Sequence, residues 1–209
     1  FKKVDPLFVI DLSNPRNPEV LGKLKIPGFS DYLHPYDEDH IIGIGKDAVE
    51  AEEGNFAWYQ GLKLAIFDVS DVENPVQMHV ELIGDRGTDS EVLQNHKAFL
   101  FDKERNLLVL PVLLAMIPED VYQGDIPSNA YGDFVFQGAY VYDISLDDGF
   151  ELKGRISHYD DSDVFDKAGY YFYDRNYYIT RSLYINDVLY TISEGKIKLN
   201  YLDDLDEIK

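Results

Sequence analysis

The sequence predicts an all-β fold, a fragment of a β-propeller with about three four-stranded antiparallel blades. A short apolar run that ends in Asp, one hydrophobic residue and Ser occurs at 9–13, 66–70 and 141–145. Apolar residues alternate with a period of two, and no long 3.6-residue pattern is present, which favours strands over helices. The chain contains 16 Tyr and 12 Phe but one Trp and two Met. Aromatic side chains suit a half-buried pleated surface, so this composition supports the same prediction.

The repeated run is the strongest of these signals, because an internal repeat identifies the structural unit directly. In the first two copies the run continues into turns rich in Asn, Asp and Pro at 14–18 and 71–75. The third copy keeps a turn of different composition. We expect the two residues before each Asp to occupy equivalent strand positions. We also expect Asp11, Asp68 and Asp143 to begin equivalent turns, with each carboxylate accepting backbone N–H groups.

The predicted strands form hairpins bounded by Pro, Gly, Asn and Asp, which are typical turn residues. In the first half of the chain they span 7–12, 20–26, 32–36, 41–45, 62–69 and 76–83. In the second half they span 97–101, 107–114, 139–144, 150–158, 182–185, 188–192 and 197–202. The segment 162–168 is long enough for one helical turn, and the pattern requires no helix of ordinary length.

Two long connections interrupt this pattern. Residues 46–61 are acidic and contain an aromatic island of Phe56, Trp58 and Tyr59, whereas residues 115–138 are rich in Gly and Pro. Long loops without secondary structure in a compact domain are usually functional or disordered. The aromatic island is therefore a candidate interaction surface. The alternative is that it packs its loop against the blade.

Units of four strands that repeat roughly every 60 to 80 residues fit propeller blades better than a β-sandwich, which needs no internal similarity. We expect residues 1–209 to form a single propeller domain that is partial, because about three blades are fewer than a closed ring usually needs. The chain starts at Phe1 rather than Met, which indicates a piece of a longer protein. Open blade edges favour pairing with another copy, so we expect a homo-oligomer.

Composition narrows the classes of function. The formal net charge of −20 disfavours nucleic acid and anionic membranes as partners, because phosphates need Lys and Arg to displace their counterions. The chain has no Cys, which removes disulfides, thiolate nucleophiles and Cys-based metal sites. No apolar stretch approaches the roughly 20 residues of a membrane-spanning helix. Basic partners and cations remain compatible with this charge.

Four stretches, at 5–15, 28–37, 83–91 and 95–101, carry a resemblance to a known family. They are similar to the C-terminal β-propeller domain of secreted prokaryotic proteins, mainly archaeal, that are distantly related to WD-repeat propellers. The element at 11–15 also resembles the LVIVD-type propeller repeat. The resemblance implies an extracellular or cell-envelope-attached propeller of uncharacterised function, in a domain longer than this chain. It brings no catalytic residues.

The candidate site residues lie at or near the start of strands that we expect to line the central channel. His34, His96 and Arg181 occupy such positions in successive units. Polar groups that converge there could bind an anion, a metal or a small ligand. The nearby carboxylates are those of Asp31, Asp89 and Glu91. Two imidazoles with these carboxylates could hold a divalent cation, but their spacing matches no known metal motif. The alternative is that each His bonds a neighbouring group between blades.

We expect a non-enzymatic binding or scaffold module, secreted or attached to the cell envelope, that recognises a protein or another extracellular ligand at its loop-bearing face. The sequence calls for no cofactor beyond a possible divalent cation. Two alternative functions stay open. A metal-dependent hydrolase or another enzyme would place a nucleophile or an acid–base pair beside His34, His96 and Arg181. A purely structural cell-envelope module would have a filled channel without a ligand.

Overall fold

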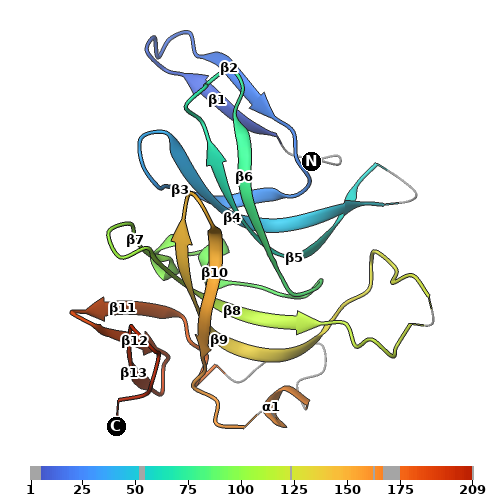
Figure 1. Cartoon of the computed structure of the whole chain (residues 1–209). Coiled ribbons are helices and arrows are strands. Elements are labelled where there is room, and N and C mark those ends of the chain that lie inside the picture. The colour runs from blue at the N-terminus through green and yellow to red at the C-terminus, as the bar shows by residue number, and fades with distance from the viewer. Residues whose placement is uncertain (1–5, 52–54, 123, 162, 167–174, 209) are drawn as a thin grey trace.

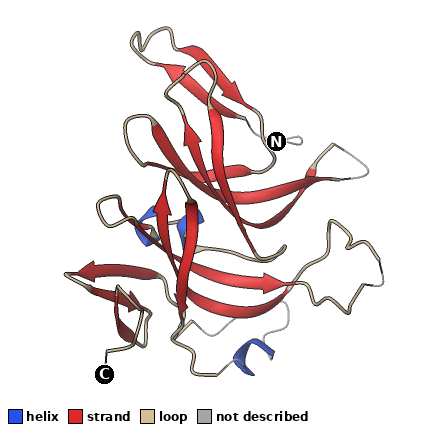
Figure 2. Ribbon diagram, viewed as in Figure 1, coloured by secondary structure: helices blue, strands red, loops and turns tan. Residues whose placement is uncertain are grey.

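The computed structural model of the chain contains antiparallel β-sheets that follow one another along the sequence (Figures 1 and 2). It describes residues 6–51, 55–122, 124–161, 163–166 and 175–208. Over these residues the first sheet has two strands, the second and third have four each, and the fourth has three. The predicted all-β class is confirmed. The expected three blades take the form of two complete four-stranded sheets with a partial sheet on either side.

The strands succeed one another in chain order within each sheet. The first sheet consists of β1 (Leu7–Asp11) and β2 (Glu19–Leu24). The second consists of β3 (Phe29–Pro35), β4 (His40–Glu50), β5 (Ala57–Asp68) and β6 (Val76–Ile83). The third consists of β7 (Leu100–Asp102), β8 (Leu107–Met116), β9 (Asp133–Ser145) and β10 (Gly149–Ile156). The fourth consists of β11 (Arg181–Ile185), β12 (Val188–Ile192) and β13 (Ile197–Tyr201).

Among the described residues, helical structure is confined to single turns in the connections between sheets. Two 3₁₀ turns, η1 (Glu91–Leu93) and η2 (His96–Ala98), precede β7, so the strand predicted from Lys97 begins only at Leu100. The helical turn predicted at 162–168 is present as α1 (Asp163–Asp166), and residues 162, 167 and 168 lie outside the described part. No helix of the described residues is long and apolar enough to cross a membrane.

The repeat is visible as one backbone hydrogen bond that recurs in three sheets. It joins a residue at or just beyond the end of the third strand to the turn between the first two strands of the same sheet. The N–H of Val69 donates to Asp39 O at 2.8 Å, and the N–H of Ile144 donates to Asn106 O at 2.8 Å. In the fourth sheet the same bond runs from Leu202 N to Asp187 O at 2.9 Å. The repeat unit is therefore one four-stranded blade.

Two of the three predicted Asp turns form as expected. The N–H of Ser13 donates to Asp11 Oδ1 at 2.7 Å, and the N–H of Ser70 donates to Asp68 Oδ1 at 2.8 Å. The prediction for Asp143 is wrong, because β9 continues to Ser145 and keeps Asp143 in the ladder opposite Glu151. The turn there is closed by the Ser145 hydroxyl, which accepts the N–H of Asp148 at 2.9 Å.

Of the two segments expected as loops, the first is largely paired strand and the second is paired strand at both of its ends. We call residues 46–61 the first arm and residues 115–138 the second arm. Pairing of β4 with β5 continues to Glu50 and Ala57, and pairing of β8 with β9 continues to Met116 and Asp133, in each case across a β-bulge. Ladder hydrogen bonds satisfy the backbone of these extensions, so polar residues there do not end the strands. Both arms extend to the same side of the molecule (Figure 1).

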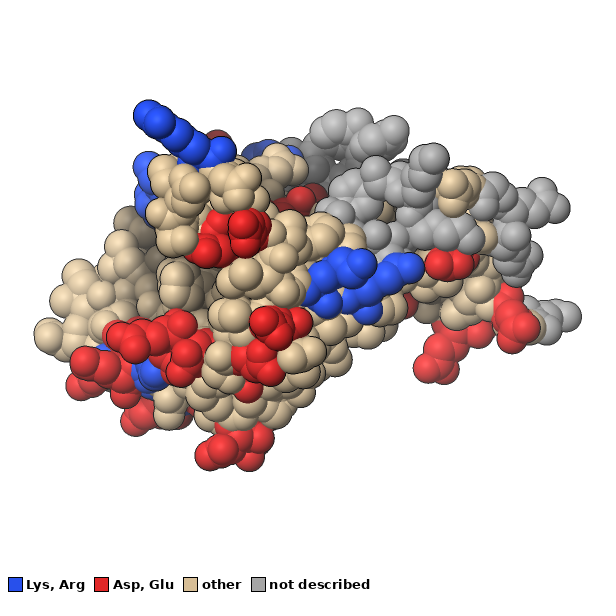
Figure 3. All heavy atoms as spheres, turned by 90° about the horizontal axis from the view of Figure 1, so that it is seen from above, with Lys and Arg blue, Asp and Glu red and all other residues tan. Residues whose placement is uncertain are grey.

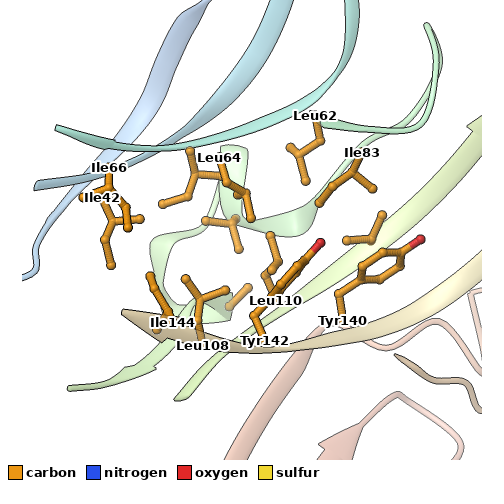
Figure 4. Packing of buried hydrophobic residues seen from close by; sticks show 14 of the residues in the cluster. Ile42, Leu62, Leu64, Ile66, Ile83, Leu108, Leu110, Tyr140, Tyr142 and Ile144 are labelled. Atoms are coloured by element: carbon orange, nitrogen blue, oxygen red, sulfur yellow. The ribbon is translucent and has the colours of Figure 1, made fainter. Parts of the chain in front are cut away.

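The core lies between neighbouring sheets. Tyr142, Leu108 and Leu110 of the third sheet point towards Leu64 and Ile66 of the second (Figure 4). Because successive strand residues point to opposite faces, Val141 belongs instead to a second core against the fourth sheet. Each fully buried aliphatic side chain of this kind contributes about 1.5–3 kcal/mol. Each of the two cores therefore holds one sheet against the next. The candidate site residues lie at these junctions between sheets.

Candidate functional site

His34 and His96 contact the same tyrosine at the junction of β3 with the η2 turn. The Tyr32 hydroxyl lies 2.7 Å from His34 Nδ1, and the Tyr32 ring stacks on the His96 ring with centroids 5.8 Å apart. Phe99 lies 5.7 Å from Tyr32 and 5.1 Å from His34, centroid to centroid. Burial among these rings lowers the pKa of His34, which favours its neutral form. The structure thus brings two predicted site residues into one aromatic cluster between blades.

The predicted carboxylates Asp31 and Asp89 lie beside a lysine that sequence reasoning missed. Lys46 Nζ is 3.3 Å from Asp89 Oδ1, and the ammonium also donates to the Thr88 carbonyl. Burial raises the pKa of Asp31, with Asp89 adding to the shift and Lys46 opposing it. Lys46 lies where β4 passes into the first arm. No local sequence signal joins residues that are more than forty positions apart.

Glu91 and Arg181 are less closely joined to this group. Glu91 begins η1, and the negative charges of Glu91 and Asp89 both disfavour ionisation of the Tyr178 hydroxyl. Burial first, and these two carboxylates next, raise the pKa of Tyr178 to about 12. Arg181 begins β11 opposite Ile192, and its exposed side chain forms no ion pair with the described residues. Asp31 and Asp89 are therefore linked through Lys46, and Asp89 and Glu91 through Tyr178.

The described residues contain no group of three or more His, Asp or Glu side chains placed to hold a metal ion. His34 Nδ1 is already engaged by the Tyr32 hydroxyl at 2.7 Å. Metal ligation through that nitrogen would require this hydrogen bond to break. The geometry of this part of the chain therefore favours the aromatic and ionic contacts between blades over a divalent-cation site.

The aromatic island is partly packed and partly exposed. Trp58 and Tyr131 sandwich the guanidinium of Arg86, whose carbon lies 4.7 Å and 4.4 Å from the two ring centroids. Arg86 Nη1 also donates to the Tyr59 carbonyl at 3.1 Å. The side chains of Phe56 and Tyr59 remain 43% and 45% exposed, so the island both fixes the arms and presents an apolar surface.

An open cavity of about 340 Å³ lies between the arms, near the point where they leave the sheets. Gln60 Nε2 of the first arm donates to the Ser128 carbonyl of the second at 2.9 Å, which ties its two walls together. The Asp85 carboxylate accepts the N–H of Ile117 at 2.7 Å and fixes the base of the second arm. The lining of the cavity combines apolar and acidic side chains, among them Val49, Leu82, Ile126, Asp47 and Asp85.

A buried imidazole at the edge of the fourth sheet also escaped sequence reasoning. His158 is 1% exposed, with Nδ1 2.9 Å from Ser193 Oγ and Nε2 2.9 Å from Thr191 Oγ1. Burial, with Lys196 and Lys198 nearby, lowers the pKa of His158 to about 4. The pair His158–Ser193 has the composition of a base and nucleophile, but its burial leaves it no contact with a substrate. We assign it a structural role.

The surface charge is distributed rather than concentrated. In the view from above, acidic side chains form several separate groups, and smaller groups of Lys and Arg lie among them (Figure 3). On this face the negative charge therefore does not by itself mark a site.

The sequence is similar to a known domain family and to two archaeal proteins. A family model described as a beta propeller domain matches residues 1–205. An uncharacterised protein of Archaeoglobus fulgidus is 45% identical over 111 residues, which are 53% of this chain and 16% of that protein. The uncharacterised protein MJ1554 of Methanocaldococcus jannaschii is 41% identical over 111 residues, again 53% of this chain and 16% of that protein. The matched segment is thus a small part of each relative.

Proposed function

The chain belongs to the beta propeller domain family, and from this premise we propose that it is a non-enzymatic binding module that recognises its partner on the arm-bearing face. We further propose that residues 1–209 are part of one propeller in a longer protein. We place that protein outside the cell or on the cell envelope, as the resemblance to secreted propellers implies.

The observation that carries this proposal is the pair of arms. Two neighbouring blades extend their central hairpins beyond the sheets on the same side, and a cavity of about 340 Å³ opens between them. Contacts between the arms, such as the Arg86 sandwich between Trp58 and Tyr131, hold the walls in place before any ligand arrives. A pre-formed surface binds more tightly, because less conformational entropy is lost on association.

The chemistry of this face favours a partner that is basic and partly apolar. The cavity presents the carboxylates of Asp47 and Asp85, and the arm beside it presents the exposed rings of Phe56 and Tyr59. Aromatic side chains are enriched at interfaces, and complementary charge steers association. A peptide segment of a protein partner that carries Lys or Arg beside an apolar residue combines both features.

Selection from a library of random peptides on the immobilised chain tests this function. We expect the selected peptides to be enriched in Lys and Arg. The double variant Asp47→Asn, Phe56→Ser should weaken their binding by at least roughly tenfold, which corresponds to about 1.4 kcal/mol. Fluorescence anisotropy with a labelled selected peptide measures the loss.

The matched control changes the same residue types elsewhere on the surface. Asp147 is exposed in the turn after β9, and Ile185 is 55% exposed at the end of β11. The variant Asp147→Asn, Ile185→Ser should bind the peptides as the wild type does. Equal losses in both variants, or peptides without any basic enrichment, would count against recognition at the arms.

A further inference from the structure

Lys63 is a charged side chain buried between the first and second sheets. It lies on β5, it is 7% exposed, and its ammonium donates to the Pro27 carbonyl at 2.7 Å. An ammonium has three donors, and among the described residues Pro27 O is the acceptor that it reaches. Burial lowers the pKa of Lys63, and Asp47 opposes this shift without forming an ion pair. A buried charge without a counter-ion is costly, so the site favours an anion.

A cavity of about 190 Å³ opens directly at this lysine. Its walls come from both sheets and are mostly apolar, with the hydroxyl of Ser30 as a further polar group. Residues that line it include Leu7, Ile26, Phe29, Ser30, Leu33 and Phe67. Leu33 is 43% exposed, so this wall of the cavity reaches the surface and gives a ligand a path inward. The cavity thus joins an apolar interior to one buried positive charge.

We propose that this cavity binds a small apolar carboxylate whose anionic group pairs with the Lys63 ammonium while its hydrocarbon part packs against Phe67, Ile26 and Leu33. The cavity lies between the first and second sheets rather than between the arms, and among the described residues the two sites are linked only through the charge of Asp47. Its volume is below the 300 Å³ or so at which drug-sized pockets usually begin, which restricts the ligand to a few carbons or one ring.

The charge and shape of the cavity decide against other ligand classes. A phosphate or sulfate would need several donors for its oxygens, and the apolar walls supply few. A cation would face the ammonium directly and be repelled. A neutral apolar molecule would fill the space but leave the charge of Lys63 without a partner. A monocarboxylate satisfies both the charge and the walls.

Methyl-detected NMR with sodium benzoate, on the full chain labelled at Leu and Ile methyl groups, tests the proposal. We expect shifts at Leu33 and Ile26 and a dissociation constant on the order of 1 mM, as a ligand of this size allows. Benzamide has the same shape without the charge and should bind at least roughly tenfold more weakly. Shifts of equal size and midpoint with benzamide, or no shifts with benzoate, would overturn the proposal.

Two variants assign the binding to the lysine and the cavity. Lys63→Met keeps an unbranched side chain that is one atom shorter and removes the charge, and it should weaken benzoate binding at least roughly tenfold. The control Lys25→Met removes an exposed lysine two residues from Pro27 and should leave benzoate affinity unchanged. If Lys63→Met fails to fold, Leu33→Trp narrows the cavity from its exposed wall and should abolish the shifts at Ile26. Unchanged affinity in Leu33→Trp, or in a folded Lys63→Met, would show that benzoate binds elsewhere and refute the site.

Discussion

At the scale of single residues, burial decides which titratable side chains have a shifted pKa. His158 is enclosed by the hydroxyls of Ser193 and Thr191, and Lys196 and Lys198 lie close enough to oppose its protonation. The exposed His96, in contrast, stacks on Tyr32 at the surface of the cluster. Both are histidines that follow a polar residue in the sequence, and only the fold separates their roles.

We expect His158 to make stability depend on pH between 6.5 and 4. Its pKa is about 4 in the folded chain and about 6.5 in the unfolded chain, so the unfolded chain binds the proton first as pH falls. The free energy of unfolding should therefore drop through this window, by roughly 3 kcal/mol at pH 4. Urea unfolding followed by circular dichroism at pH 7, 6, 5 and 4 measures the slope.

The variant His158→Gln separates this effect from the titration of carboxylates, which both proteins share. Glutamine keeps hydrogen-bonding groups for Thr191 and Ser193 but takes up no proton. Its free energy of unfolding should fall less steeply over the same pH range. Parallel slopes in the two proteins would mean that His158 is protonated without cost in the folded state.

At the scale of elements, the turn between β7 and β8 connects three sheets. Lys103 Nζ lies 2.8 Å from Asp37 Oδ2 of the second sheet, and this contact together with His40 holds the pKa of Asp37 well below its usual range against the opposing effect of burial. Arg105 Nη1 lies 3.1 Å from Asp187 Oδ1 of the fourth sheet and packs over Tyr184. One turn thus fixes the relative position of its two neighbours.

The Asp turns give a prediction at the same scale. Asp68→Ala removes an acceptor that holds the N–H of Ser70, whereas Asp143→Ala removes a carboxylate that closes no turn. We expect Asp68→Ala to lower the thermal midpoint clearly more than Asp143→Ala does. Differential scanning calorimetry of the two variants beside the wild type provides the comparison. A larger loss in Asp143→Ala would show that its contact with Lys153, at 3.9 Å, matters more than the turns.

The sequence predicted strands better than it predicted their ends. Val76–Ile83 and Val188–Ile192 have the expected bounds, because turn residues flank them on both sides. The arms were missed, since runs such as 57–59 and 134–136 are continuously apolar and carry no alternation to reveal pairing. The Asp31–Lys46–Asp89 group was found only in part, because the lysine joins it through tertiary contact. Secondary-structure propensity depends on residues that are close in the sequence. It does not predict which distant residue completes a site.

At the scale of the whole molecule, the first and last sheets leave apolar side chains uncovered. Ile10 is 50% exposed, although the equivalent residues Phe67 and Tyr142 are buried where sheets meet. Ile185 and Ile197 of the fourth sheet are 55% and 59% exposed. Internal junctions of the stack bury such positions, and the two outer surfaces of the described residues do not.

We expect the isolated 209-residue chain to self-associate through these outer surfaces, because exposed apolar side chains and unpaired strand edges favour pairing. The double variant Ile10→Glu, Ile197→Glu places a charge on each outer surface and should shift the sedimentation coefficient towards that of the monomer. The control Val121→Glu alters a side chain that is 59% exposed on the second arm and should sediment as the wild type does. A wild-type chain that stays monomeric at every concentration would contradict this expectation.

In the fourth sheet, Tyr201 stands where the second and third sheets have Asp, and yet the N–H of Leu202 still bonds the Asp187 carbonyl at 2.9 Å. A contact between main-chain atoms survives divergence that erases the side chains around it. A count of blades by the Asp-x-Ser signature would therefore miss the fourth sheet of this chain. The recurring unit is better recognised by this main-chain bond, which is present even where the Asp is not.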